Sequence, residues 1–174
     1  DYPESIWKHV FENQISNLSQ CILGILMTVG TPIYLSDLKL SISNFAKKHS
    51  AKYGIKYSEL ELKKSLRELE NTFIITKANT RDEIIVEYQN PSVQDFLVHY
   101  FREIPDFIIN IIEGAVFFNQ LFDIFTTSET EKIHKIFTGN KNTITLTKDL
   151  NDSILKKLLL DYHSLNYPNL PPYE

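Results

Sequence analysis

Residues 72–92 read TFIITKANTRDEIIVEYQNPS, and this stretch decides the fold. It holds two runs rich in β-branched and aromatic residues, Thr72–Thr76 and Ile84–Tyr88, which are typical of strands. The polar residues between the runs, 77–83, predict a hairpin loop. Asn90 suits the cap of a helix and Pro91 suits its first position, so a helix is expected to begin as soon as the second strand ends.

Upstream of the hairpin, the apolar residues recur at helical spacing. They predict a short helix over residues 5–13 and a longer one from about Ser16 to Val29, which Gly30-Thr31-Pro32 ends. Residues 33–35 are too few for more than an edge strand.

Two further helices are expected before the hairpin. Ser36 is expected to cap the first, whose apolar face gives way to Lys47-Lys48-His49 and Gly54. Ser58, with Glu61 three residues later, forms a capping box for the second. From residue 16 to 89 the order is therefore helix, short strand, helix, helix, strand, strand, which is the winged helix-turn-helix arrangement.

Downstream of Pro91 the chain is predicted to stay mostly helical. Pro105 ends one helix and Asp106 begins another, and residues 107–125 are apolar nearly all round, which predicts a buried pair of helices. From residue 128 onward the composition turns polar. There we expect an amphipathic helix over 129–137, a loop over 138–142, a helix from Asp149 or Asn151 to Leu160, and an extended tail over 167–172.

The sequence thus predicts a mainly α fold: a winged helix-turn-helix with a two-stranded β wing, followed by a helical bundle. The predicted units are an N-terminal helix plus winged helix (1–90), a helical extension packed on it (91–127), and a C-terminal helical segment with its tail (128–174).

Composition limits the functional classes. The 174 residues are 43% hydrophobic and include only five glycines, which favours a packed core over disorder. The net charge of −4 argues against a general affinity for nucleic acid or membranes. Cys21, the single cysteine, excludes an intrachain disulfide and is expected to be buried and inert. With no signal peptide or membrane-spanning run evident, a cytoplasmic protein is predicted.

No catalytic or metal site is predicted. The carboxylates at Glu59 and Glu61, and at Glu68 and Glu70, lack the apolar pocket that acid–base catalysis needs. The five histidines show no metal-ligand spacing. Residues 138–143 lack the first glycine of a phosphate-binding loop. We therefore expect neither enzymatic activity nor a cofactor in this chain itself.

One segment has a basic bias, which keeps a DNA-binding role open. The candidate contacts are Lys47, Lys48, Lys52 and Lys56. The helix that would enter the major groove, however, carries four acids against three bases between residues 59 and 70, a net charge of −1, which argues against nucleic acid.

The segment from Ile85 to Leu97 carries a resemblance to a known family. Its Asn90-Pro-Ser-Val-Gln-Asp-Phe-Leu97 resembles an Asn-Pro-Ser-Val-x-Asp-Phe-Leu signature at the end of the wing in bacterial STAND-class nucleoside triphosphatases. Trp7 and Phe117–Gln120 are also similar to that group. The resemblance covers roughly residues 5–126 and places this chain after the ATPase core.

The resemblance implies a regulatory role in a signalling ATPase, many of which act in bacterial defence. The expected partners are an upstream nucleotide-binding domain of the same chain, which would bind ATP or ADP with magnesium, and a downstream sensor region. In related members a histidine at the end of the wing senses the bound diphosphate; here Asn90 stands in that place. Its amide can donate a hydrogen bond but carries no charge. Asn90 is thus either a helix cap alone or a cap that also contacts nucleotide.

Three functional hypotheses follow. The first is the non-catalytic regulatory module of a STAND-type ATPase. The second is a free-standing winged-helix regulator that binds DNA, and the third is a plain protein-interaction domain.

Overall fold

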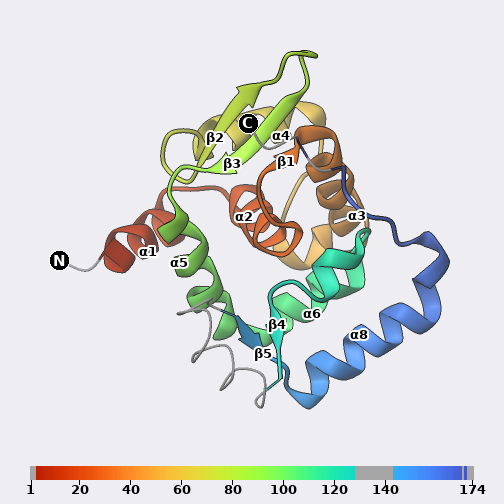
Figure 1. Cartoon of the computed structure of the whole chain (residues 1–174). Helices are drawn as coiled ribbons and strands as arrows, with labels where there is room; N and C mark the ends of the chain where they lie inside the picture. The colour runs from red at the N-terminus through yellow and green to blue at the C-terminus, as the bar shows by residue number, and fades with distance from the viewer. Residues whose placement is uncertain (1–2, 128–142, 170, 172–174) are drawn as a thin grey trace, which may run out of the picture.

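The computed structural model describes residues 3–127, 143–169 and 171, and it is mainly helical (Figure 1). The helices are α1 (Pro3–Asn13), α2 (Asn17–Val29), α3 (Leu35–Tyr53), α4 (Glu59–Leu69), α5 (Pro91–Arg102), α6 (Pro105–Gly114) and α8 (Lys148–Asp161). The strands are β1 (Ile33–Tyr34), β2 (Ile74–Ala78), β3 (Ile84–Tyr88), β4 (Phe125–Thr126) and β5 (Ile144–Thr145). In Figure 1, α2 lies near the middle of the molecule, with the sheet above it and α6 below it.

The predicted order of elements between residues 16 and 89 is confirmed as α2, β1, α3, α4, β2, β3. β3 is the central strand of a three-stranded antiparallel sheet with the order β1-β3-β2, so β1 is the edge strand that was expected. Ile33 pairs with Val86, and Ile74 pairs with Tyr88. The hairpin therefore gains a third strand from the segment between α2 and α3.

The predicted bounds of the first hairpin strand are wrong by two residues, because β2 runs from Ile74 to Ala78. The backbone turns at Asn71, whose φ is 63°, and the N–H of Phe73 donates to Leu69 O at the end of α4. Phe73 therefore belongs to the turn that leaves the helix. The hairpin loop is short because Asn79 Oδ1 accepts the N–H groups of Arg81 (2.8 Å) and Glu83 (3.0 Å).

The predicted start of α3 is also wrong. The helix begins at Leu35, directly after β1, and its N-cap Tyr34 makes no side-chain capping bond, so Ser36 is not the cap. The helix continues through residues 47–49 to Tyr53, with Phe45, Ala46 and His49 buried on its inner face. It ends at Gly54, which has the left-handed φ of 61° that glycine tolerates.

The helix start at Pro91 is confirmed, whereas the helix pair over residues 107–125 is wrong. α6 begins at Pro105 and ends at Gly114, where an added Cβ would lie 3.1 Å from Phe45 Cα, so α3 approaches α6 closely here. Beyond it, Gln120 Oε1 accepts the N–H groups of Val116 (2.9 Å) and Phe117 (3.1 Å). A 3-10 turn (Phe118–Leu121) and β4 follow in place of a second helix.

In the C-terminal segment, the helix expected over 129–137 and the loop expected over 138–142 lie outside the described residues. α8 begins at Lys148 with Thr147 as its N-cap, earlier than Asp149 or Asn151, because Thr147 Oγ1 accepts the Leu150 N–H. A 3-10 turn (Tyr162–Ser164) follows. The tail then runs back to α3, where the N–H of Asn169 donates to Asp37 Oδ2 at 2.7 Å.

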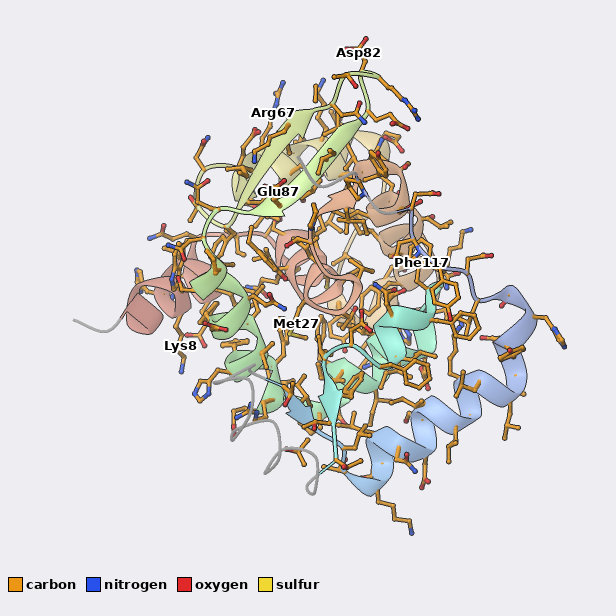
Figure 2. The ribbon with its side chains drawn as sticks, viewed as in Figure 1. Lys8, Met27, Arg67, Asp82, Glu87 and Phe117 are labelled. Atoms are coloured by element: carbon orange, nitrogen blue, oxygen red, sulfur yellow. The ribbon has the colours of Figure 1, made fainter. Side chains whose placement is uncertain are left out.

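A single hydrophobic cluster of buried side chains extends from Phe11 to Leu165. α2 supplies its centre, where Met27 has no exposed surface (Figure 2). Phe11 joins α1 to α5 through edge-to-face contacts with Phe96 and Phe101 at centroid distances of 5.8 and 5.7 Å. The described residues on both sides of residue 90 thus share one core, and the predicted unit boundaries stay a prediction.

Candidate interaction groove

α4 has one buried face and one face turned to solvent. Its N-cap Ser58 accepts the N–H of Glu61 at 3.2 Å, as the capping box predicted, although the Glu61 carboxylate pairs with Lys64 at 2.7 Å. Leu62 and Leu69 are buried and hold the helix against the core. The helical repeat therefore places residues 60, 63 and 67 on the outward face.

An apolar groove of about 490 Å³ lies between the start of α3, α4 and the sheet. Its apolar lining comes from Leu35, Leu60, Leu62, Leu66 and Ile84. Leu60 is 62% exposed and Ile84 is 44% exposed, so two large aliphatic side chains face solvent across the same groove. Contiguous exposed apolar surface with a polar rim is typical of protein–protein contact sites.

The acids of α4 each have a partner within the chain. Glu59 pairs with Lys39 at 2.9 Å, and Glu70 accepts the Thr76 hydroxyl at 2.5 Å. Glu68 accepts the N–H of Ser16 at 2.9 Å and the hydroxyls of Ser16 and Ser19 at the start of α2. Lysines therefore offset Glu59 and Glu61, whereas the partners of Glu68 and Glu70 are neutral groups, which do not cancel a charge.

Glu68 also has a shifted acidity. Burial alone would raise the pKa of Glu68, but the hydrogen bonds from Ser19 and Ser16 outweigh it and hold the pKa below its usual value. Its charge lies at the N-terminus of α2, where the helix dipole favours an anion. Glu68 thus acts as a second cap that ties α4 to α2.

The bases on the same face are left free. Lys63 and Arg67 line the groove, and within the described part of the chain neither forms an ion pair. The groove therefore combines an apolar floor with a charged rim, on which three bases (Lys39, Lys63 and Arg67) outnumber two acids (Glu59 and Glu70). The sequence did not lead us to predict this groove. Leu60 was nevertheless a signal, because it lies outside the apolar stripe of an otherwise amphipathic helix.

The four predicted DNA-contacting lysines lie elsewhere, and none of them lines the groove. Lys47 and Lys56 are exposed. Lys48 donates to Glu113 O at 2.7 Å, and the Lys52 ammonium lies 5.7 Å from the centre of the Tyr53 ring. Lys48 and Lys52 thus have partners within the chain.

Asn90 caps α5 as predicted. Its Oδ1 accepts the N–H of Ser92 at 2.9 Å, and its side chain is exposed. Its Nδ2 donates no hydrogen bond to any other described residue and so leaves a donor for a partner. The nucleotide contact predicted for Asn90 stays a prediction.

The cysteine of this chain is a buried free thiol. Cys21 is 3% exposed, and burial raises the pKa of its thiol to about 12, as expected for an inert cysteine. Among residues 3–127, 143–169 and 171, no group of three histidine, cysteine or carboxylate side chains is placed to hold a metal ion. No helix in these ranges is both long and apolar enough to cross a membrane.

Comparisons of the chain with models of protein families, with curated proteins and with solved structures found no match.

Proposed function

We propose that this chain is a non-catalytic interaction module built on a winged helix-turn-helix, and that it regulates a STAND-type ATPase of which it is a part. The element order α2, β1, α3, α4, β2, β3 supports the winged-helix assignment, as does the pairing of β1 with β3. In that arrangement α4 is the recognition helix and the β2–β3 hairpin, with Asp82 at its tip, is the wing (Figure 2).

The α4–sheet groove is the observation that carries the proposal. Leu60 and Ile84 offer apolar surface, and Lys63 and Arg67 offer charge without a partner in the described chain. This combination fits a protein surface with aliphatic side chains flanked by carboxylates. We assign that surface to the nucleotide-binding domain upstream in the parent protein, so that docking couples its nucleotide state to a sensor region downstream.

Asn90 gives the module a direct route to the nucleotide. It stands at the end of the wing, its exposed amide has a spare donor, and the α5 N-terminus behind it favours an anionic group. In this proposal the cap orients the amide towards the diphosphate of the partner domain, in the place where related members carry histidine.

The test uses the chain and the protein segment encoded upstream of it, produced as two polypeptides and titrated by calorimetry. Leu60→Asp and Ile84→Asp should abolish binding, because each puts a carboxylate into the apolar floor. Leu159→Asp is the matched control, since Leu159 is 85% exposed on α8 and lies outside the groove. If all three variants lose binding equally, or if none of them loses it, the groove is not the docking site. An upstream segment without a phosphate-binding loop contradicts the ATPase assignment alone.

One observation favours DNA binding as a second candidate. Lys63 and Arg67 are exposed on the outward face of α4 and form no ion pair among the described residues, whereas Glu59 and Glu61 are paired with Lys39 and Lys64. If α4 enters a major groove, duplex affinity falls steeply with salt and Lys63→Glu with Arg67→Glu removes it. If binding is lost instead when Lys47, Lys48 and Lys52 are changed to Glu, the DNA contact lies on α3. If the chain does not bind duplex DNA, or binds it independently of salt, both the contact through α4 and the contact through α3 are excluded.

A further inference from the structure

A second cleft, of about 530 Å³, lies where the end of α3, the end of α6 and α8 meet. α3 contributes Lys48 and His49, α6 contributes Glu113, and α8 contributes Lys157 and Asp161. The cleft shares no lining residue with the α4–sheet groove. With Asp152 and Lys156, which α8 also contributes, seven titratable side chains from three helices thus converge in a place that the proposed docking does not use.

Two ammonium groups meet at one backbone oxygen in this cleft. Lys48 Nζ donates to Glu113 O at 2.7 Å, and Lys157 Nζ donates to the same oxygen at 3.1 Å. This carbonyl belongs to the last turn of α6, where unpaired carbonyls and the helix dipole attract cations. Helix capping explains one lysine, but a second ammonium at the same oxygen is repelled by the first.

The two lysines are not equivalent. Lys157 is 6% exposed and lies 2.6 Å from Asp161 Oδ2, so its charge has a carboxylate partner. Within the described residues no carboxylate lies at ion-pair distance from Lys48, which is also the more exposed of the two. Loss of a proton from Lys48 therefore relieves the repulsion at the smaller cost.

The surroundings of Lys48 act in the same direction. Burial and the nearby Lys157 charge lower the pKa of Lys48 against the opposing effect of Asp161 and Glu113. His49 Nε2 lies 3.6 Å from Glu113 Oε2 and has no hydrogen-bond partner among the described residues, and burial lowers the pKa of this imidazole. A second cation beside a lysine favours loss of its proton, and the unprotonated amine is the form that acts as a nucleophile.

We propose that this cleft binds small carbonyl compounds and that Lys48 captures them as a Schiff base. The neutral Nζ adds to the carbonyl carbon and forms a C–N bond. Its two hydrogens leave with the carbonyl oxygen as water, and a C=N bond remains. The step is a condensation and needs no oxidant or reductant.

The whole chain is treated near neutral pH with limiting acetaldehyde and cyanoborohydride, and the ethylated lysines are identified by peptide mass spectrometry. Lys48 should be the first lysine labelled. Lys47 is the matched control, because it is the exposed neighbour on the same helix and lies outside the cleft. Labelling of Lys47 as fast as that of Lys48 overturns the proposal.

Variants of Lys157 separate nucleophilicity from simple exposure. Lys157→Met removes the second cation and should reduce Lys48 labelling to the rate of Lys47, whereas Lys157→Arg keeps the charge and the preference. Circular dichroism reports whether each variant folds. If Lys157→Met does not fold, Asp161→Asn replaces it: with the Lys157 charge uncompensated, Lys48 labelling should rise above wild type. Labelling of Lys48 that stays unchanged in the folded variants overturns the proposal.

Discussion

Replacing Gly24 with alanine tests how closely α2 and α6 approach each other in the core. An alanine Cβ at this position would collide with Cε1 of the Phe107 ring and would lie 2.9 Å from its Cζ. The ring has little room to move away, because Phe107 is 6% exposed and stacks on Phe101 at a centroid distance of 4.6 Å. The added methyl group must therefore displace packed side chains.

Two opposing effects set the size of the change. Alanine is better than glycine inside a helix by about 1 kcal/mol, whereas overpacking a tight core costs about 1–3 kcal/mol. We expect the free energy of unfolding to fall by about 1 kcal/mol, which lowers Tm by about 2–4 °C in a chain of this size.

Urea denaturation followed by circular dichroism measures this change. The double variant Gly24→Ala/Phe107→Leu is the control, because the smaller leucine makes room for the methyl group. Its loss should be smaller than the sum of the two single losses. A Gly24→Ala protein that is about 1 kcal/mol more stable than wild type refutes the close approach, since that is how alanine behaves at an open helical position.

Three further predictions concern caps and burial. Glu68→Gln should cost about 1 kcal/mol at neutral pH after allowance for solvent screening. Because folding lowers the pKa of Glu68, this loss of stability is present above the pKa of the unfolded state and fades as the pH falls through the pKa of the folded state. Urea denaturation at neutral and at acid pH measures the difference. Equal losses of stability at the two pH values would contradict the prediction. Asn90→Ala should cost about 1 kcal/mol in thermal unfolding and Asn90→Asp much less, whereas equal losses would show that the Ser92 bond does not cap α5. The Cys21 thiol, 3% exposed, should react with a thiol reagent only after unfolding, and rapid reaction of the native protein would contradict its burial.

Local signals predicted some helix starts correctly, although Ser36 was wrongly expected to cap α3. Ser58 caps a helix because its hydroxyl accepts a backbone N–H group, and Pro91 starts a helix because it needs no N–H partner. These choices depend on neighbours in the sequence, so the sequence alone contains them.

The errors had two causes. The apolar run from Phe107 to Phe125 has helical composition, but the Gln120 side chain accepts the N–H groups of Val116 and Phe117, a local contact that the apolar pattern does not reveal. The close contact of Gly114 with Phe45 depends instead on how α3 and α6 pack, which no local pattern reports.

The candidate groove was missed for a related reason. Counting charges along α4 gives a net acid, yet the partners of Glu59, Glu68 and Glu70 come from α3, α2 and β2. The groove itself forms only when α3, α4 and the sheet pack together, so its lining follows from tertiary contacts. Leu60, which lies outside the apolar stripe of α4, was the one signal visible in the sequence.

Side-chain footprinting by hydroxyl radicals tests the proposed docking surface most directly. In the isolated chain Leu60, Ile84 and the control Leu159 are all exposed, so all three should be oxidised. In the complex with the upstream segment, the account predicts that Leu60 and Ile84 become protected while Leu159 stays reactive. Continued oxidation of Leu60 and Ile84 in a complex that protects Leu159 would contradict it.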